Sequence, residues 1–253
     1  MVKSKVFLVG PFIGSLFWES YYFAPYIIHL KKEHSKKIIV FTRSSRFDLY
    51  GVYADIFVPL LLSNDLTQNQ YCFTIKDFST NTYNSLVESY KKQYSTKFDI
   101  IDHIYPDISF FYYKLKWQFP RQLMDYDFQP RVYNKEIVKR YVNQDTILLD
   151  ISAKPLIRNM RNINSLISKY INLVVPEKSS VLGCVIESIK LCRYVIGNLS
   201  SNVSKLALLL KTPLIIVNQT CTYDEIHLLN PHNTPVVIAP TVEKGVNIGE
   251  NYF

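Results

Sequence analysis

The chain has 253 residues, of which 48% are hydrophobic and 20% are charged, and its formal net charge is +8. This composition can supply a buried core and excludes a largely disordered chain. No apolar stretch reaches the ~18–20 residues that span a bilayer. Residues 6–18 are apolar but interrupted by glycine and proline, which indicates a strand and a loop rather than a targeting segment. We therefore expect a soluble, cytoplasmic protein.

The positive charge predicts an anionic partner. Nucleic acid, acidic lipid and nucleotide diphosphates are all attracted by such a field. The alternative is codon bias, because Lys, Ile, Asn and Tyr are abundant together, as expected from an AT-rich genome.

The first sixty residues have the pattern of a βαβ unit. Residues 6–9 form a short β-branched run that ends at a Gly-Pro pair, and apolar residues then recur at helical spacing over residues 22–30. Pro25 either opens that helix or kinks it. Strands are predicted at residues 38–41 and 54–58. Strand, helix and strand in this order predict a parallel sheet.

The middle of the chain is less regular. Its apolar patterns predict a strand at residues 71–75, a helix at 82–94 and a strand at 98–104. Residues 116–131 contain prolines without a sustained period and are our candidate linker. We expect two domains, residues 1–125 and residues 126–253.

The second half alternates helices and strands more sharply. Strands are predicted at residues 146–150, 194–196 and 213–217, and helices over 181–189 and 203–210. The turns between them carry glycine or proline. We expect an α/β protein with two Rossmann-like lobes, each built on a parallel sheet, and a cleft between them.

The loop after the first strand is the first candidate site. It contains Gly10 and Gly14, and Glu19 follows it. Ligands of parallel sheets bind beyond the carboxyl ends of the strands, where helix N-termini offer unpaired N–H groups. Glu19 could deprotonate an attacking hydroxyl there. The alternative is that Glu19 only complements the helix dipole.

A cationic loop after the strand at 146–150 is the second candidate. Fixed cations stabilise the negative charge of a departing nucleoside diphosphate without a metal. The alternative is a solvated basic loop. Beyond this loop, Glu177 could accept hydrogen bonds from the ribose hydroxyls of a nucleotide. The residues assigned to the cationic loop are Ser152, Lys154, Arg158 and Arg161.

A polar turn between a strand and a helix is the third candidate. Ser200 or Ser201 can cap the helix, and the helix N-terminus can hold a phosphate. We assign Asn198 and Asn202 to the same binding turn. Helix capping alone also requires small polar residues here, so the turn is open to both interpretations.

Two weaker candidates remain. Asp125 and Asp127 match the DxD pattern with which some glycosyltransferases bind a divalent metal, but such a spacing arises often by chance. We expect no metal and no cofactor. His103, at the end of a predicted strand, is an alternative general base.

Four stretches resemble a known class of enzymes. The stretch RYVIGNLSSNVSKLALLLKTPLIIVN is similar to the C-terminal domain of GT-B glycosyltransferases, closest to their heptosyltransferase-like and O-fucosyltransferase-like branches. The N-terminal domain of small bacterial and viral glycosyltransferases resembles GPFIGSLFWESYYFAPYIIHL and VFTRSSRFDLYGVYADIFVPL. RNMRN resembles an arginine–asparagine step that precedes the first helix of the C-terminal domain.

The resemblance implies an acceptor-side N-terminal domain and a C-terminal domain that binds a nucleotide sugar. It implies that Gly14 and Glu19 flank the acceptor, and Arg43 lies within the stretch VFTRSSRFDLYGVYADIFVPL. Phosphate and sugar would meet the later residues, which are Ser152, Arg158, Arg161, Ser200, Ser201 and Asn202.

The implied activity is metal-independent transfer of a sugar from a nucleotide-diphosphate sugar to a hydroxyl of a glycan or of a hydroxymethylated DNA base. If the chain is viral, it would act in the host cytoplasm. The alternatives are a nucleotide-sugar epimerase-like enzyme and a non-catalytic module that binds nucleic acid or a partner protein.

Overall fold

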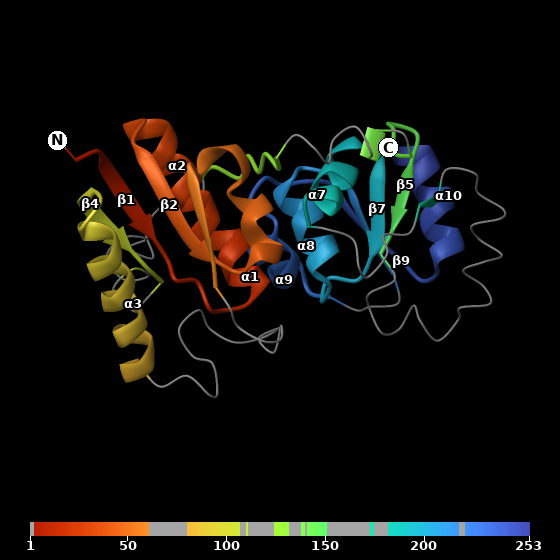
Figure 1. Ribbon diagram of the computed structural model, residues 1–253. Coiled ribbons are helices and arrows are strands. Elements are labelled where there is room, and N and C mark those ends of the chain that lie inside the picture. Colours follow the sequence, from red (N-terminus) through yellow and green to blue (C-terminus); the bar gives the residue numbers. More distant parts are fainter. Residues whose placement is uncertain are drawn as a thin grey trace. The chain divides into compact units, whose positions relative to one another are not determined.

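The computed structural model describes residues 3–60, 80–106, 110, 124–131, 138–139, 141–150, 173–174, 182–217 and 221–253. The chain divides into two compact units, Met1–Pro130 and Arg131–Phe253 (Figure 1). The predicted boundary after residue 125 lies shortly before this division. Within the described residues, no helix combines the length and the apolar character that crossing a bilayer requires.

The first unit is built on a four-stranded parallel sheet. Its strand order is β3-β2-β1-β4. All three neighbouring pairs run parallel, which confirms the predicted βαβ arrangement. The strands are β1 (Lys5–Val9), β2 (Lys37–Thr42), β3 (Ile56–Pro59) and β4 (Asp99–Ile104).

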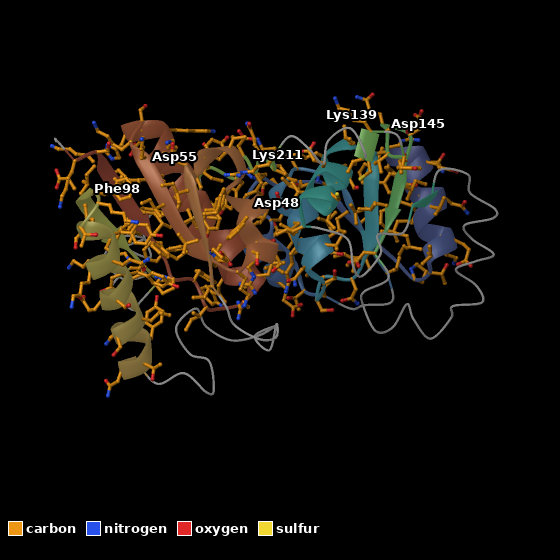
Figure 2. All side chains as sticks on the ribbon, in the orientation of Figure 1. Asp48, Asp55, Phe98, Lys139, Asp145 and Lys211 are labelled. Atoms are coloured by element: carbon orange, nitrogen blue, oxygen red, sulfur yellow. The ribbon has the colours of Figure 1, made fainter. Side chains whose placement is uncertain are left out.

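Both faces of this sheet are covered, as alternating side chains in buried strands require. Phe41 points to the face covered by helix α3 (Thr80–Ser95), where its ring centroid lies 4.1 Å from that of Tyr90. Phe7 points to the other face, with its ring 5.7 Å from that of His34 in helix α2 (Ala24–His34). An ion pair also holds α2 to the start of β3, since Lys31 Nζ lies 2.7 Å from Asp55 Oδ2. Asp55 is labelled in Figure 2.

A continuous helical stretch follows the first loop. It consists of α1 (Leu16–Trp18), a π-helical turn η1 (Glu19–Phe23) and α2. Pro25 lies in the first turn of α2, which is one of the two predicted positions, and α2 continues from the π-turn without a break. Proline has no N–H for the carbonyl four residues earlier, that of Tyr21. The Tyr126 hydroxyl donates to this Tyr21 carbonyl instead, at 3.4 Å.

The second unit is built on a five-stranded sheet. Its order is β6-β5-β7-β8-β9, and all four neighbouring pairs are parallel, as predicted. The strands are β5 (Ile147–Leu149), β6 (Leu173–Val174), β7 (Tyr194–Gly197), β8 (Leu214–Val217) and β9 (Val236–Ala239). The described helices are α7 (Leu182–Leu191), α8 (Asn202–Leu209), α9 (Tyr223–Leu229) and α10 (Val242–Tyr252).

Helices cover both faces of the second sheet. Val242 and Val246 of α10 pack on one face, in a core that includes Tyr194, Ile196 and Ile215. The crossovers from β6 through α7 to β7 and from β7 through α8 to β8 run in the same direction across the sheet. Right-handed crossovers therefore place α7 and α8 together on the opposite face, where Figure 1 shows them adjacent. Both helices begin at the carboxyl edge of the sheet.

Candidate functional site

The structure groups the described candidates into two clusters, one in each unit. The first lies at the carboxyl ends of β1 and β2 and includes Gly14, Glu19 and Arg43. The second follows β7 and includes Asn198, Ser200, Ser201 and Asn202. Five predicted residues lie outside the described residues: Ser152, Lys154, Arg158, Arg161 and Glu177.

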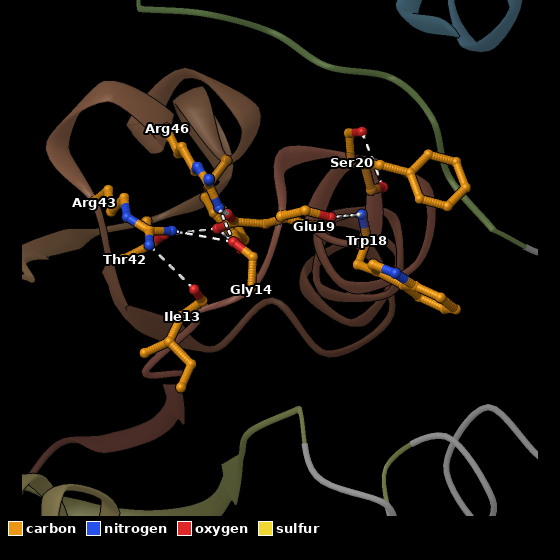
Figure 3. A network of polar contacts seen from close by, with 11 residues as sticks. Ile13, Gly14, Trp18, Glu19, Ser20, Thr42, Arg43 and Arg46 are labelled. Carbon is orange, nitrogen blue, oxygen red and sulfur yellow. Dashed lines mark hydrogen bonds and ion pairs between the residues drawn. The ribbon is translucent and has the colours of Figure 1, made fainter. Parts of the chain in front are cut away.

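Glu19 is the centre of the first cluster. Its side chain is 0% exposed. Thr42 Oγ1 donates to Oε1 at 2.7 Å, and the Arg46 guanidinium donates to Oε2 at 2.9 Å (Figure 3). Tyr50 Oη also donates to Oε1, at 2.8 Å. Burial and the Glu19 charge hold the pKa of Tyr50 well above its usual value, so this hydroxyl stays a donor. Both carboxylate oxygens are thus engaged within the protein.

Two buried arginines fix the end of the first loop. Arg43 donates to the carbonyls of Ile13 and Gly14, at 3.1 and 3.0 Å, and Arg46 donates to the Gly14 carbonyl at 2.6 Å (Figure 3). A guanidinium offers five donors in a rigid fork, so it can join several acceptors at once. Arg46 therefore connects the Glu19 carboxylate to the loop backbone.

Two further side chains fix the start of the same loop. Tyr83 of α3 donates to the carbonyl of Pro11 at 2.9 Å, and His103 Nε2 lies 2.7 Å from the carbonyl of Gly10. A carbonyl only accepts, so Nε2 carries the proton. Burial lowers the pKa of His103, which favours the neutral ring. Gly10 itself has a φ of +91°, where a side chain would be strained, and a Cβ would collide with the Phe41 carbonyl.

This geometry makes the first loop a preformed element. Side chains from β4, α3 and the segment after β2 hold its carbonyls, and Glu19 anchors one of them, Arg46. The contacts favour a positioning role for Glu19, and its role as general base stays a prediction. Sequence reasoning missed Arg46, Tyr50 and Tyr83. The available signal was a carboxylate within an apolar helical stretch, because a buried charge requires a partner.

The carboxylates of the DxD pair, Asp125 and Asp127, are bound by side chains of the same unit. Lys32 of α2 pairs with both Asp125 and Asp127, and Tyr53 Oη donates to Asp127 Oδ2 at 2.7 Å. Burial and this hydrogen bond raise the pKa of Tyr53 to about 12. The two carboxylates thus have a structural explanation as a tie between α2 and residues 125–127. The described parts of the chain contain no group of three His, Cys, Asp or Glu arranged to hold a metal ion.

The second cluster is a capped turn. Asn198 Oδ1 accepts from the backbone N–H and the hydroxyl of Ser200, at 2.9 and 2.6 Å. Ser201 is the N-cap of α8, since its Oγ accepts from the Val203 N–H at 3.1 Å. The predicted capping is therefore confirmed. Asn198 and Ser201 are buried, whereas Ser200 is exposed at the tip of the turn.

A buried polar pair lies beneath this turn. Asp150, at the end of β5, is 1% exposed and accepts from the Ser204 hydroxyl at 3.2 Å. Gly197 leaves room for it: a Cβ there would lie 3.1 Å from Asp150 Cβ and would collide with Ser204 Oγ. The sequence argument named neither Asp150 nor Ser204. An acidic residue directly after an apolar strand was the available signal.

Comparison with known proteins supports the fold. No protein-family model and no curated protein sequence matches the chain. Among solved structures, a glycosyl transferase family 9 protein from Veillonella parvula DSM 2008 is similar with a TM-score of 0.53 and 9% identity. This match covers 99% of the chain and 89% of that protein. At this identity the likeness concerns the fold, which is that of GT-B proteins, as predicted.

Two further solved structures have lower TM-scores. E. coli ADP-heptose LPS heptosyltransferase II has a TM-score of 0.49 and 11% identity, over 93% of this chain and 90% of that one. E. coli heptosyltransferase WaaC, solved with ADP, has a TM-score of 0.49 and 11% identity, over 98% and 97% of the two chains.

Proposed function

We propose that the protein is a metal-independent glycosyltransferase that moves a sugar from a nucleotide-diphosphate sugar to a hydroxyl acceptor. The observation that carries this proposal is the GT-B fold, which extends over nearly the whole chain. Each unit also has its polar loop at the carboxyl end of a parallel sheet, where ligands of such sheets bind.

The donor belongs, in this proposal, to the second unit. The N-terminus of α8 and the turn that includes Ser200 offer N–H and hydroxyl donors to phosphate oxygens. Arg158 and Arg161, in the segment after β5, would stabilise the charge that develops on the departing diphosphate. Ser152, Lys154 and Glu177 complete the proposed donor site, with Glu177 on the ribose.

The acceptor belongs to the first unit. As the acceptor oxygen bonds to the anomeric carbon, the bond from that carbon to the diphosphate breaks and a base takes the hydroxyl proton. Glu19 is the base that we predicted, and His103 is the alternative. Glu19 could serve only if the hydrogen bonds from Thr42 and Tyr50 rearranged.

Calorimetric titration with UDP-, GDP- and ADP-sugars tests the donor proposal. We expect one of these to bind the native protein and Arg161→Ala to bind it at least tenfold more weakly. Lys190→Ala, an exposed position on α7, is the matched control. If no nucleotide sugar binds the native protein, the proposal is wrong.

The acceptor class is tested separately. The net charge of +8 favours a polyanion such as DNA with hydroxymethylated bases, and a glycan is the other candidate. Binding to duplex DNA should weaken by orders of magnitude between about 50 and 200 mM salt if several phosphates are contacted. A flat salt response would favour a glycan acceptor.

A further inference from the structure

An open groove lies at the amino edge of the first sheet, where the end of α3 meets the starts of β1 and β4. Its volume is about 740 Å³. Lys3 Nζ donates to the carbonyl of Ser95 at 2.8 Å, and the Asp99 N–H donates to the carbonyl of Ser4 at 3.0 Å. Half-buried Phe98, labelled in Figure 2, also lines the groove. These hydrogen bonds hold the three segments around the groove together.

Exposed lysines gather around this groove. Lys5 begins β1, Lys37 begins β2 and Lys97 lies two residues before β4. These strands are parallel and adjacent, so their starts lie within about 10 Å of one another. We call the exposed lysines of this region the lysine edge, which consists of Lys3, Lys5, Lys36, Lys37, Lys91, Lys92 and Lys97.

The charge of the lysine edge is not neutralised by the described carboxylates. Glu88 lies three residues before Lys91 on α3, but the two form no ion pair. Asp99 is the register partner of Lys5 and forms none either. Among the residues that the structure describes, no lysine of this edge has a carboxylate oxygen within 4.0 Å. The ammonium groups are thus available to an external anion.

Helix electrostatics explain only part of this arrangement. A lysine in the last turn of a helix complements the helix dipole, which accounts for Lys92. Lys5 and Lys37 begin strands, where no such dipole acts. Like charges that lie within about one Debye length of each other repel, which is about 8 Å at physiological salt. Their concentration on one edge is understandable if a polyanion binds there.

The side chains of the edge favour the phosphate backbone of a nucleic-acid duplex. Lysine is a point charge that attracts phosphate without reading bases. No large hydrophobic side chain is exposed among residues 3–5 and 91–100, so these segments offer no group to insert into a bilayer or to stack on unpaired bases. A duplex carries one negative charge per about 1.7 Å of its axis, so an edge of about 10 Å faces several phosphates.

We propose that the lysine edge of the first unit binds the phosphate backbone of duplex DNA. The edge lies at the amino ends of the strands, whereas the loop after β1 lies at their carboxyl ends. Binding at the edge requires neither a nucleotide sugar nor sugar transfer. The inference therefore stands apart from the proposed function and fails or holds independently of it.

Fluorescence anisotropy of a short labelled duplex, titrated at several salt concentrations, tests the proposal. The variant Lys91→Gln/Lys92→Gln/Lys97→Gln removes three charges from the edge. We expect it to bind at least about tenfold more weakly than the native protein at about 50 mM salt. The slope of log K against log salt should become shallower by about 2–3, because each lost phosphate contact contributes about 0.9.

A matched control removes the same charge elsewhere. The variant Lys139→Gln/Lys190→Gln/Lys244→Gln changes three exposed lysines of the second unit. It should alter the affinity by less than about threefold, because only the general field of the protein changes. Both triple variants should unfold at the temperature of the native protein, since all six side chains are exposed.

A change of the opposite sign sharpens the test. Glu88→Gln removes an exposed negative charge from the groove and should strengthen binding by about two- to fivefold, because the carboxylate repels phosphate. Glu250→Gln, an exposed position on α10, makes the same change in the second unit and should leave the affinity unchanged. A merely structural role of the edge predicts no gain of affinity for Glu88→Gln.

Three outcomes would overturn the inference. The first is equal loss of affinity in the two triple variants, which would show that net charge and not the edge determines binding. The second is absence of duplex binding by the native protein at about 50 mM salt. The third is binding to vesicles that contain phosphatidylserine without binding to DNA, which would identify a membrane as the partner.

Discussion

The loop after β1 and the turn after β7 occupy equivalent places in their sheets but differ in how their polar groups are satisfied. In the first unit, side chains of three elements hold the loop carbonyls, and the Glu19 carboxylate accepts three hydrogen bonds. In the second unit, Ser200 is exposed and buried Glu187 accepts no described bond at Oε1. The polar groups of the first loop are hydrogen-bonded within the protein. In the second unit, the Ser200 side chain and Glu187 Oε1 could still form hydrogen bonds with a ligand.

The largest effect is expected at Glu19. Glu19→Gln leaves the buried guanidinium of Arg46 without its charge partner, and breaking a buried ion pair costs about 3–5 kcal/mol. The free energy of unfolding from urea titration measures this loss. Glu33→Gln, an exposed position on α2, is the control and should cost less than about 1 kcal/mol. A similarly small loss at Glu19 would contradict the claim that the ion pair of Glu19 with Arg46 stabilises the first loop.

A smaller loss is expected at Gly197. Gly197→Ala brings a Cβ into collision with the Ser204 hydroxyl, and such overpacking costs about 1–3 kcal/mol. Urea titration of the single variant and of the double variant with Ser204→Ala tests this. Removing the hydroxyl should restore part of the stability, because the two positions are in contact. Purely additive losses would show that the contact is not the cause.

Two serines of the turn should separate stability from binding. Ser201→Ala removes the N-cap of α8 and should cost about 1 kcal/mol of stability. Ser200→Ala, at the exposed tip, should change stability by less than about 0.5 kcal/mol but weaken nucleotide binding. Unfolding and calorimetric titrations of both variants measure the two effects. The reverse pattern would contradict our assignment of the turn.

The smallest effect is a pH dependence in the first unit. Burial lowers the pKa of His103 below its ordinary 6.5, so the unfolded chain binds this proton more readily than the folded one. The His103 contribution to stability is therefore present above pH 6.5 and is lost as the pH falls from there through the lowered pKa. His103→Gln cannot titrate, and its stability should fall less steeply between pH 6.5 and 5. Identical slopes for both proteins would contradict this.

The sequence patterns predicted the sheets better than the site. Strands such as β1 and β8 are short apolar runs bounded by glycine or proline, so their limits are visible in the sequence. The helix α10 was not predicted, although Val242, Val246 and two glycines at its buried positions follow helical spacing. Glycine lowers the hydrophobic contrast on which such predictions depend.

The partners in the site were hidden for a different reason. Glu19 was noticed, but Arg46 and Tyr50 lie 27 and 31 residues away in the chain, and no local pattern joins them to it. Asp150 and Glu187 each lie in an apolar segment, and a single acidic residue in such a segment does not show in the sequence whether it is buried. Their burial follows from the packing of helices on the sheet, which the order of residues does not display.

The π-turn at Glu19–Phe23 has a consequence for how this helical stretch could change during evolution. A π-turn corresponds to one extra residue in an α-helix, and one residue rotates everything beyond it by about 100°. Deleting a single residue within the turn would restore regular α-helical geometry, but it would move either Glu19 away from Arg46 or Ile27 and Ile28 out of their buried positions. The two halves of the stretch can therefore tolerate substitutions separately, whereas their spacing along the chain is constrained.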